Sequence, residues 1–71
     1  MTNTNALYQA VRRSGYLLRY VAQSLHLSYQ GFLNKAKNKS EFTASEIQTL
    51  VALLKLSAEE RDVIFFAAKV D

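Results

Sequence analysis

The chain has 71 residues, a formal net charge of +3, and neither Cys nor Pro. Without Cys it can form no disulfide, thiolate zinc site or thiol catalyst, and its single His leaves little material for catalysis. Two Gly, no Pro and long apolar repeats of 3.6 residues predict an all-α protein with one domain over residues 1–71.

The first expected helix covers residues 5–14. Thr4 or Asn5 can cap its start, because a short polar side chain there accepts a hydrogen bond from a free backbone N–H. Gly15 can adopt the left-handed conformation that ends many helices. The apolar residues that share one face and should enter the core are Leu7, Ala10 and Val11.

Two short helices joined by a short turn are expected at residues 18–25 and 28–37. Leu17 occupies the cap position of the first helix and cannot accept a hydrogen bond, so its start is weakly signalled. Ser28 can cap the second helix, whose inner face holds Phe32. Helices joined by so short a turn meet at a steep angle, and this spacing predicts a helix-turn-helix motif with a protruding second helix.

Capping boxes mark the starts of the last two expected helices. In the pair Thr43 and Glu46, and again in Ser57 and Glu60, each side chain can bond the other residue's backbone N–H. The fourth helix then continues with one apolar stripe formed by Ile47, Leu50, Val51 and Leu54. These two starts are the best-signalled features of the sequence.

The fifth helix is expected to bury one apolar stripe, formed by Val63, Phe66, Ala67 and Val70. This stripe leaves Ile64 and Phe65 pointing partly elsewhere. Either the small bundle wraps around the helix and buries both residues as well, or they contact a partner, for example in a weak homodimer.

The charges are unevenly distributed along the chain. Six of the nine cationic residues precede residue 41, whereas all six acidic residues follow residue 40. A basic half that coincides with a helix-turn-helix is typical of a phosphate-binding surface. The simpler explanation, in which these cations only solvate exposed faces, stays open because six charges are few.

Much of the chain, from about Ala6 to Phe66, resembles the small helix-turn-helix regulators of temperate phages, the family of Cro and the repressor N-terminal domains. The stretches that carry the resemblance, in order, are Val21-Ala22, Leu25-His26-Leu27-Ser28, Phe32, Phe42-Thr43, Glu46-Ile47, Leu54-Lys55-Leu56-Ser57 and Glu59-Glu60. It extends to Cro-like proteins of Gram-positive phages and to modulator-of-repression proteins of lactococcal-type phages. The resemblance implies a five-helix, lambda-repressor-like DNA-binding fold and a role in the lysis–lysogeny switch.

Three residues depart from the family pattern. The family usually has Ser or Thr where Leu17 stands, and a Gln that anchors a backbone phosphate where Leu18 stands. His26 stands at the turn position usually held by Gly, so we expect it to adopt a positive φ at a cost of about 1 kcal/mol.

The outward face of the third expected helix is the candidate binding surface. Gln30 and Asn34 could form paired hydrogen bonds with adenine edges in a major groove. The other candidates for contact with DNA or a partner are Leu18, Arg19, Ser28, Tyr29, Leu33 and Lys37, and the candidates for phosphate contact are Lys35, Asn38 and Lys39. On this hypothesis a Cro-like dimer binds a two-fold operator directly.

The composition of this face also suits a protein partner. It carries Leu18, Tyr29 and Leu33 but no Arg on the third helix, and apolar residues ringed by Lys and Asn build protein-binding hot spots. In a phage switch the partner would be the N-terminal domain of the phage repressor, bound alone or jointly with operator DNA. We therefore favour an anti-repressor, or modulator of repression, over a Cro-like operator-binding repressor.

Enzymatic activity, metal binding and membrane association are all disfavoured by the sequence. The acids Glu59, Glu60 and Asp62 fall in the first turn of a helix, where they offset its dipole, and His26 has no second ligand near it. No signal peptide is visible and the longest apolar run is too short for a bilayer, so we expect a cytoplasmic protein of the bacterial host. The apolar side of the basic first helix is needed by the core rather than by a membrane surface.

Overall fold

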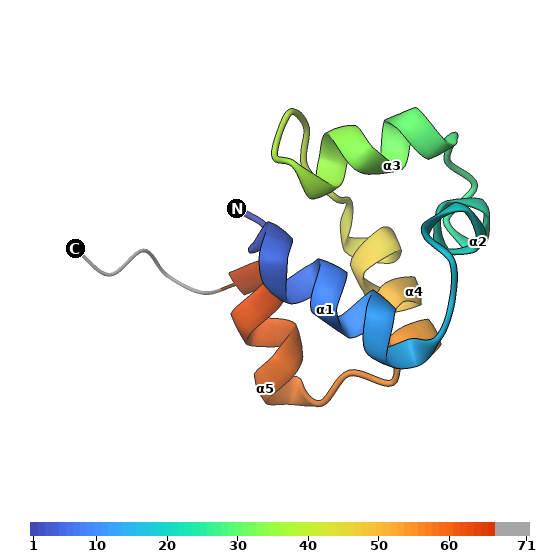
Figure 1. The fold of residues 1–71 in the computed structure, drawn as a ribbon. Coiled ribbons are helices and arrows are strands. Elements are labelled where there is room, and N and C mark those ends of the chain that lie inside the picture. Colours follow the sequence, from blue (N-terminus) through green and yellow to red (C-terminus); the bar gives the residue numbers. More distant parts are fainter. Residues whose placement is uncertain (67–71) are drawn as a thin grey trace.

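Five α-helices, the last of which continues into a π-helical segment, form the described part of the chain, residues 1–66 of a computed structural model (Figure 1). In chain order they are α1 (Thr4–Ser14), α2 (Leu18–Ser24), α3 (Tyr29–Ala36), α4 (Ala44–Leu54), α5 (Ala58–Arg61) and η1 (Asp62–Phe66). No strand occurs within residues 1–66, so the predicted all-α class is confirmed for this range.

The start of α1 differs from the prediction by one residue or more. Asn3, rather than Thr4 or Asn5, is the cap, and its side chain accepts a hydrogen bond from the N–H of Ala6 at 3.1 Å. Thr4 is already helical and its hydroxyl donates instead to the carbonyl oxygen of Ala36. The long-range bond to α3 therefore occupies a side chain that the sequence alone assigns to a local cap.

The other helix starts follow the sequence closely. Ser28, Thr43 and Ser57 cap α3, α4 and α5, and both predicted capping boxes are formed. Leu17 has extended backbone and provides no side-chain cap for α2, as expected from its chemistry. Because α2 has only seven residues and no such cap, its stability depends on the packing of its buried face.

Left-handed backbone ends several of the helical segments. Gly15 follows α1 with φ 83°, and its N–H donates to the carbonyl oxygen of Arg12. His26 has φ 59°, which confirms the predicted positive φ in the turn between α2 and α3. Asn38 and Lys55 adopt the same conformation after α3 and α4, with φ 68° and 54°. A side chain in this region costs about 1 kcal/mol that Gly avoids.

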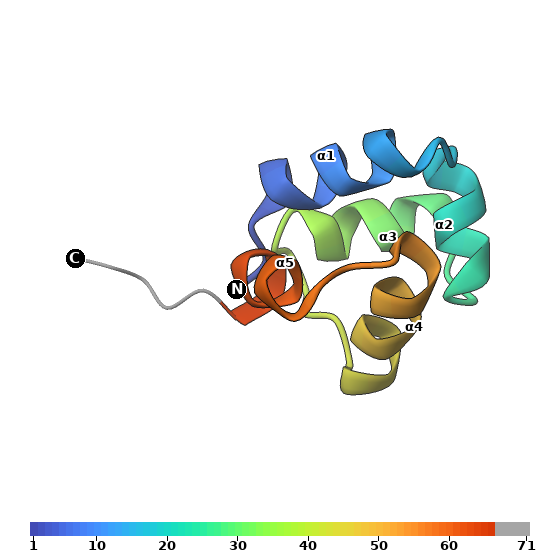
Figure 2. The same cartoon turned by 90° about the horizontal axis from the view of Figure 1, so that it is seen from below.

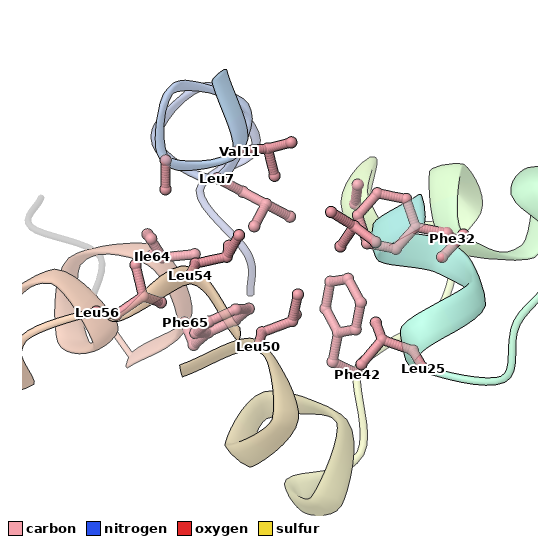
Figure 3. Close-up of a cluster of buried hydrophobic side chains, with 14 residues drawn as sticks. Leu7, Val11, Leu25, Phe32, Phe42, Leu50, Leu54, Leu56, Ile64 and Phe65 are labelled. Atoms are coloured by element: carbon pink, nitrogen blue, oxygen red, sulfur yellow. The ribbon is translucent and has the colours of Figure 1, made fainter. Parts of the chain in front are cut away.

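One apolar core joins helices α1 to α4 with η1 (Figure 3). Three phenylalanine rings contact one another in series, with centroids 5.9 Å apart between Phe32 and Phe42 and 5.7 Å apart between Phe42 and Phe65. Full burial of one such side chain contributes about 1.5–3 kcal/mol. The series fixes α3 to the C-terminal segment of the described chain.

The register of η1 contradicts the predicted apolar stripe. Ile64 and Phe65 are buried, with 3% and 5% of their surface exposed, whereas Val63 and Phe66 are 51% and 58% exposed. A π-helical turn has i→i+5 hydrogen bonds, so the spacing of one face is wider than the 3.6 residues that the prediction assumed. Of the two alternatives for Ile64 and Phe65, burial by the bundle is therefore confirmed and the contact with a partner is wrong, because both residues belong to the core. Ala67 and Val70 lie outside the described residues.

Residues at the chain start hold the C-terminal end of α3 against η1. The Asn38 side chain accepts a hydrogen bond from the N–H of Thr2 at 2.8 Å and donates to the Thr2 carbonyl oxygen at 2.9 Å. The N–H of Asn3 donates to the Ile64 carbonyl oxygen at 2.7 Å. In Figure 1, α3 lies along one edge of the molecule, and in both views α2 runs in a clearly different direction (Figures 1 and 2).

Candidate binding face on helix α3

The turn between α2 and α3 presents one side of α3 to solvent. The N–H groups of Leu25 and Leu27 both donate to the Ala22 carbonyl oxygen, which closes α2 tightly before Ser28 caps α3. Phe32 and Ala36 are fully buried and anchor the inner side of α3. The opposite side therefore faces away from the core.

Two side-chain amides occupy this outer side. The Gln30 amide nitrogen donates to the Asn34 side-chain oxygen at 2.9 Å, one helical turn further along. Gln30 is exposed and Asn34 is half-buried. Each amide keeps a further donor or acceptor for a ligand, because an amide group can form up to four hydrogen bonds. The predicted pair is thus brought together on one face.

Arg19 and Tyr29 meet at the N-terminal end of this face. The Arg19 guanidinium lies 5.5 Å from the centroid of the Tyr29 ring, within the range of a cation–π contact. Both residues are exposed. The contact joins the first turn of α2 to the first turn of α3 and presents an aromatic ring and a positive charge together.

The sequence predicts that Lys35 contacts a phosphate. In the structure, Lys35 instead pairs with Glu46 of α4. Its ammonium nitrogen lies 2.7 Å from the Glu46 carboxylate, and the two side chains are only 17% and 14% exposed. Burial alone would raise the pKa of Glu46, but hydrogen bonds from Lys35 and Thr43, with the charge of Lys35, hold the pKa below its ordinary value. Lys35 therefore attaches α3 to α4.

The other phosphate candidates separate into two groups. Lys37 and Lys39 are exposed and form no salt bridge within residues 1–66, so both are available to an anion. The half-buried Asn38 is partly occupied, because its side chain accepts a hydrogen bond from the Thr2 N–H and donates one to the Thr2 carbonyl oxygen. Asn38 therefore attaches the chain start to α3, and its phosphate contact stays a prediction.

The apolar candidates on this face are less exposed than the sequence predicts. Leu18 and Leu33 are both half-buried and pack against the core. The sequence interpretation places an exposed Leu33 beside Tyr29, but Leu33 is half-buried, so its exposed apolar area is smaller than predicted. Tyr29, 41% exposed, is therefore the principal apolar group on the described α3 face.

Three exposed apolar residues lie beside this face and were missed by the sequence analysis. The Tyr16 and Tyr20 rings contact each other in a tilted pair with centroids 5.0 Å apart, and Leu17, which follows Tyr16 in the chain, is 76% exposed. The spacing of the two tyrosines, four residues, could have indicated such a pair, since neither belongs to a buried stripe. Leu17 was considered only as a poor helix cap.

Metal binding and membrane spanning have no structural support in residues 1–66. No three His, Cys, Asp or Glu side chains gather there as a metal would require, and no helix in that range is long and apolar enough to span a membrane. His26 is exposed in the turn. The α3 face holds most of the residues that the sequence predicts as contacts.

A scan against protein-family models found no match, and searches of curated proteins and of solved structures found none either.

Proposed function

We propose that the chain is a helix-turn-helix transcription regulator that binds operator DNA directly, with α3 as its recognition helix. The observation that carries the proposal is the pairing of Gln30 and Asn34 on the outer side of α3. Side-chain amides recognise adenine through its N6 and N7 atoms, and a major groove is wide enough for one α-helix. The resemblance to phage regulators supports a role in a lysis–lysogeny switch.

The charges around α3 support the same proposal. Arg19 contacts Tyr29 at the start of α3, and Lys37 and Lys39 directly follow its end. None of the three cations forms a salt bridge within residues 1–66. Glu46, which contacts α3, is paired with Lys35, whereas the exposed Glu41 lies in the loop after α3. Phosphates at the two ends of α3 could therefore meet cations.

This proposal reverses the order of the two hypotheses drawn from the sequence. The anti-repressor hypothesis drew on Leu18 and Leu33 as exposed apolar contacts, and both are half-buried against the core. What remains for it on this face is Tyr29, exposed beneath the Arg19 guanidinium. Tyr and Arg are the residues most enriched in protein-binding hot spots, so binding of a phage repressor N-terminal domain is kept as the second candidate function.

Duplex binding by the chain alone tests the first candidate. Fluorescence anisotropy with labelled duplexes at low salt should give a complex whose log affinity falls linearly with log salt. Three phosphate contacts correspond to a slope of about −2.7. No duplex complex at micromolar protein and low salt would contradict direct operator binding.

The second candidate is tested by size-exclusion chromatography with light scattering. It predicts a complex with the repressor N-terminal domain of the same phage in the absence of DNA. Tyr29→Ala should break that complex if the contact uses this face, whereas Gln48→Ala on the exposed side of α4 should not. Co-elution that survives Tyr29→Ala would exclude the α3 face as the repressor contact.

A further inference from the structure

A second concave surface lies beside the α3 face, between the end of α1 and the starts of α2 and α3. It has a volume of about 510 Å³. We call it the tyrosine groove, and the lining residues used below are Tyr8, Arg12, Tyr16, Leu17, Arg19 and Tyr29. It shares Leu18, Arg19 and Tyr29 with the candidate contacts of the α3 face, whereas Arg12, Tyr16 and Leu17 belong to the groove alone, so it can be tested separately.

The groove exposes apolar and aromatic groups that bind proteins better than phosphates. Leu17 at its edge is 76% exposed, more than any other large apolar residue within residues 1–66. The Tyr16 ring beside it contacts the Tyr20 ring, with centroids 5.0 Å apart and planes tilted by 38°. A tyrosine has few rotatable bonds, so it provides a large contact area with little loss of conformational entropy. A hydrophobic side chain fits such a surface.

The charges of the groove are all positive. Arg12 and Arg19 line it, no acidic residue does, and neither Arg forms a salt bridge within residues 1–66. By contrast, the neighbouring Arg13 is paired with Glu60 on the opposite side of α1. Guanidinium groups bind carboxylates in a two-bond geometry, so an acidic occupant complements the groove.

We propose that the tyrosine groove binds a segment of a partner protein in which apolar side chains alternate with Asp or Glu. The apolar side chain would lie against Tyr16 and Leu17, and the carboxylate would accept hydrogen bonds from Arg12. The charge of the groove selects against basic segments, and its aromatic surface selects against purely polar ones. This proposal holds whether or not α3 reads DNA.

Selection from a random dodecapeptide library on the immobilised chain tests this proposal. We expect enrichment of peptides that carry both acidic and apolar residues. Binding of a selected peptide can be followed through tyrosine fluorescence, because the chain has four Tyr and no Trp. Three of these tyrosines line the groove and the fourth contacts Tyr16, so the signal is local to the site.

Leu17→Ser is the most informative variant. It removes the apolar edge, and it places a good helix cap at a position that already has the extended backbone of a cap, with φ −75° and ψ 147°. The variant should therefore fold at least as well as the parent while its peptide affinity falls about tenfold or more. Val63→Ser, on an exposed part of η1, is the matched control and should bind as the parent does.

The charge is tested by Arg12→Gln against Lys55→Gln. Both remove one exposed cation, but only Arg12 lines the groove, so only Arg12→Gln should weaken the selected peptides. Three results would overturn the proposal: no enrichment over the starting library, enrichment of basic peptides, or selected peptides that bind Leu17→Ser as tightly as the parent. If Leu17→Ser and Arg12→Gln instead weaken duplex DNA binding, the groove is a DNA contact.

Discussion

The Lys35 ammonium and the Glu46 carboxylate, 2.7 Å apart, connect the candidate recognition helix to α4. The same Glu46 oxygen accepts a hydrogen bond from the N–H of Thr43 at 2.9 Å, so one side chain completes the α4 capping box and holds α3. Because this pair is mostly shielded from solvent, the position of α3 depends on it more than on a surface ion pair.

Substitutions of Glu46 separate its two roles. Glu46→Gln can still accept from the Thr43 N–H but loses the charge that meets the shielded Lys35 ammonium, so we expect a loss of about 1–3 kcal/mol in the free energy of unfolding. Glu46→Ala also loses half of the capping box and should cost about 1 kcal/mol more. Urea denaturation followed by circular dichroism measures both. Equal stability of the two variants would mean that the cap contributes nothing.

The free energy of unfolding should fall in acid, because two carboxylates that stabilise the fold, Glu46 and Glu60, become protonated. The backbone N–H of Ser57 and the Arg13 guanidinium hold the pKa of Glu60 below its ordinary value, and the pKa of Glu46 is also lowered. A carboxyl whose pKa is lower in the folded state stabilises the fold above its unfolded pKa, which is about 4.3 for Glu, and loses this contribution as the pH falls through the folded pKa.

Thermal unfolding between pH 6 and pH 3 checks this expectation. The melting temperature should drop below about pH 4.5, and Glu46→Gln should flatten part of that drop. Glu59→Gln is the matched control, because Glu59 is exposed and forms no salt bridge in the part of the chain described. A pH profile of Glu46→Gln that matches the parent would contradict the assignment.

Alanine substitutions of two adjacent phenylalanines, Phe65 and Phe66, test which face of η1 is buried. Phe65 is 5% exposed and contacts Phe42, so Phe65→Ala should cost about 3–5 kcal/mol. Phe66 is 58% exposed, and Phe66→Ala should cost less than about 1 kcal/mol. If Phe65→Ala does not fold, Phe65→Leu keeps the comparison measurable. A larger loss of stability for Phe66→Ala than for the Phe65 variant, measured by denaturation, would support the stripe predicted from the sequence.

His26→Gly should stabilise the turn between α2 and α3. His26 has φ 59°, where a side chain costs about 1 kcal/mol, although Gly also gains freedom in the unfolded chain. We expect a net gain of about 0.5 kcal/mol in the free energy of unfolding. Gly15→Ala, at φ 83°, is the opposite control and should be destabilising by about 1 kcal/mol. Destabilisation by His26→Gly would mean that the imidazole makes a contribution of its own.

Features that depend on neighbouring residues could be predicted from the sequence. Ser28, Thr43 and Ser57 act as caps because each needs only a backbone N–H two or three residues away. The positive φ of His26 was predicted correctly because, on the resemblance to the phage regulators, His26 stands at a turn position usually held by Gly. The burial of Phe32 and the exposure of Gln30 followed from the same helical periodicity.

Features that depend on residues far apart in the chain could not be predicted from the sequence. Lys35 was interpreted as a phosphate contact because its partner, Glu46, belongs to another helix. The sequence likewise gives no sign that the Asn38 side chain bonds to the backbone of Thr2, 36 residues earlier in the chain. The π-helical turn buries Phe65 against Phe42, and no local spacing near Phe65 indicates that contact.

Duplexes selected from a random-sequence library on the parent chain, and then titrated against its variants, test the central claim most directly. The account predicts an enriched sequence that contains adenine. Gln30→Ala should weaken binding of that sequence by about 1–3 kcal/mol and relax the preference at one base pair. Gln48→Ala should leave both the affinity and the preference unchanged. Lys37→Ala should weaken all duplexes alike and reduce the salt slope by about 0.9. No enriched sequence, or an enriched sequence bound equally by Gln30→Ala, would contradict the assignment of α3 as the helix that reads DNA.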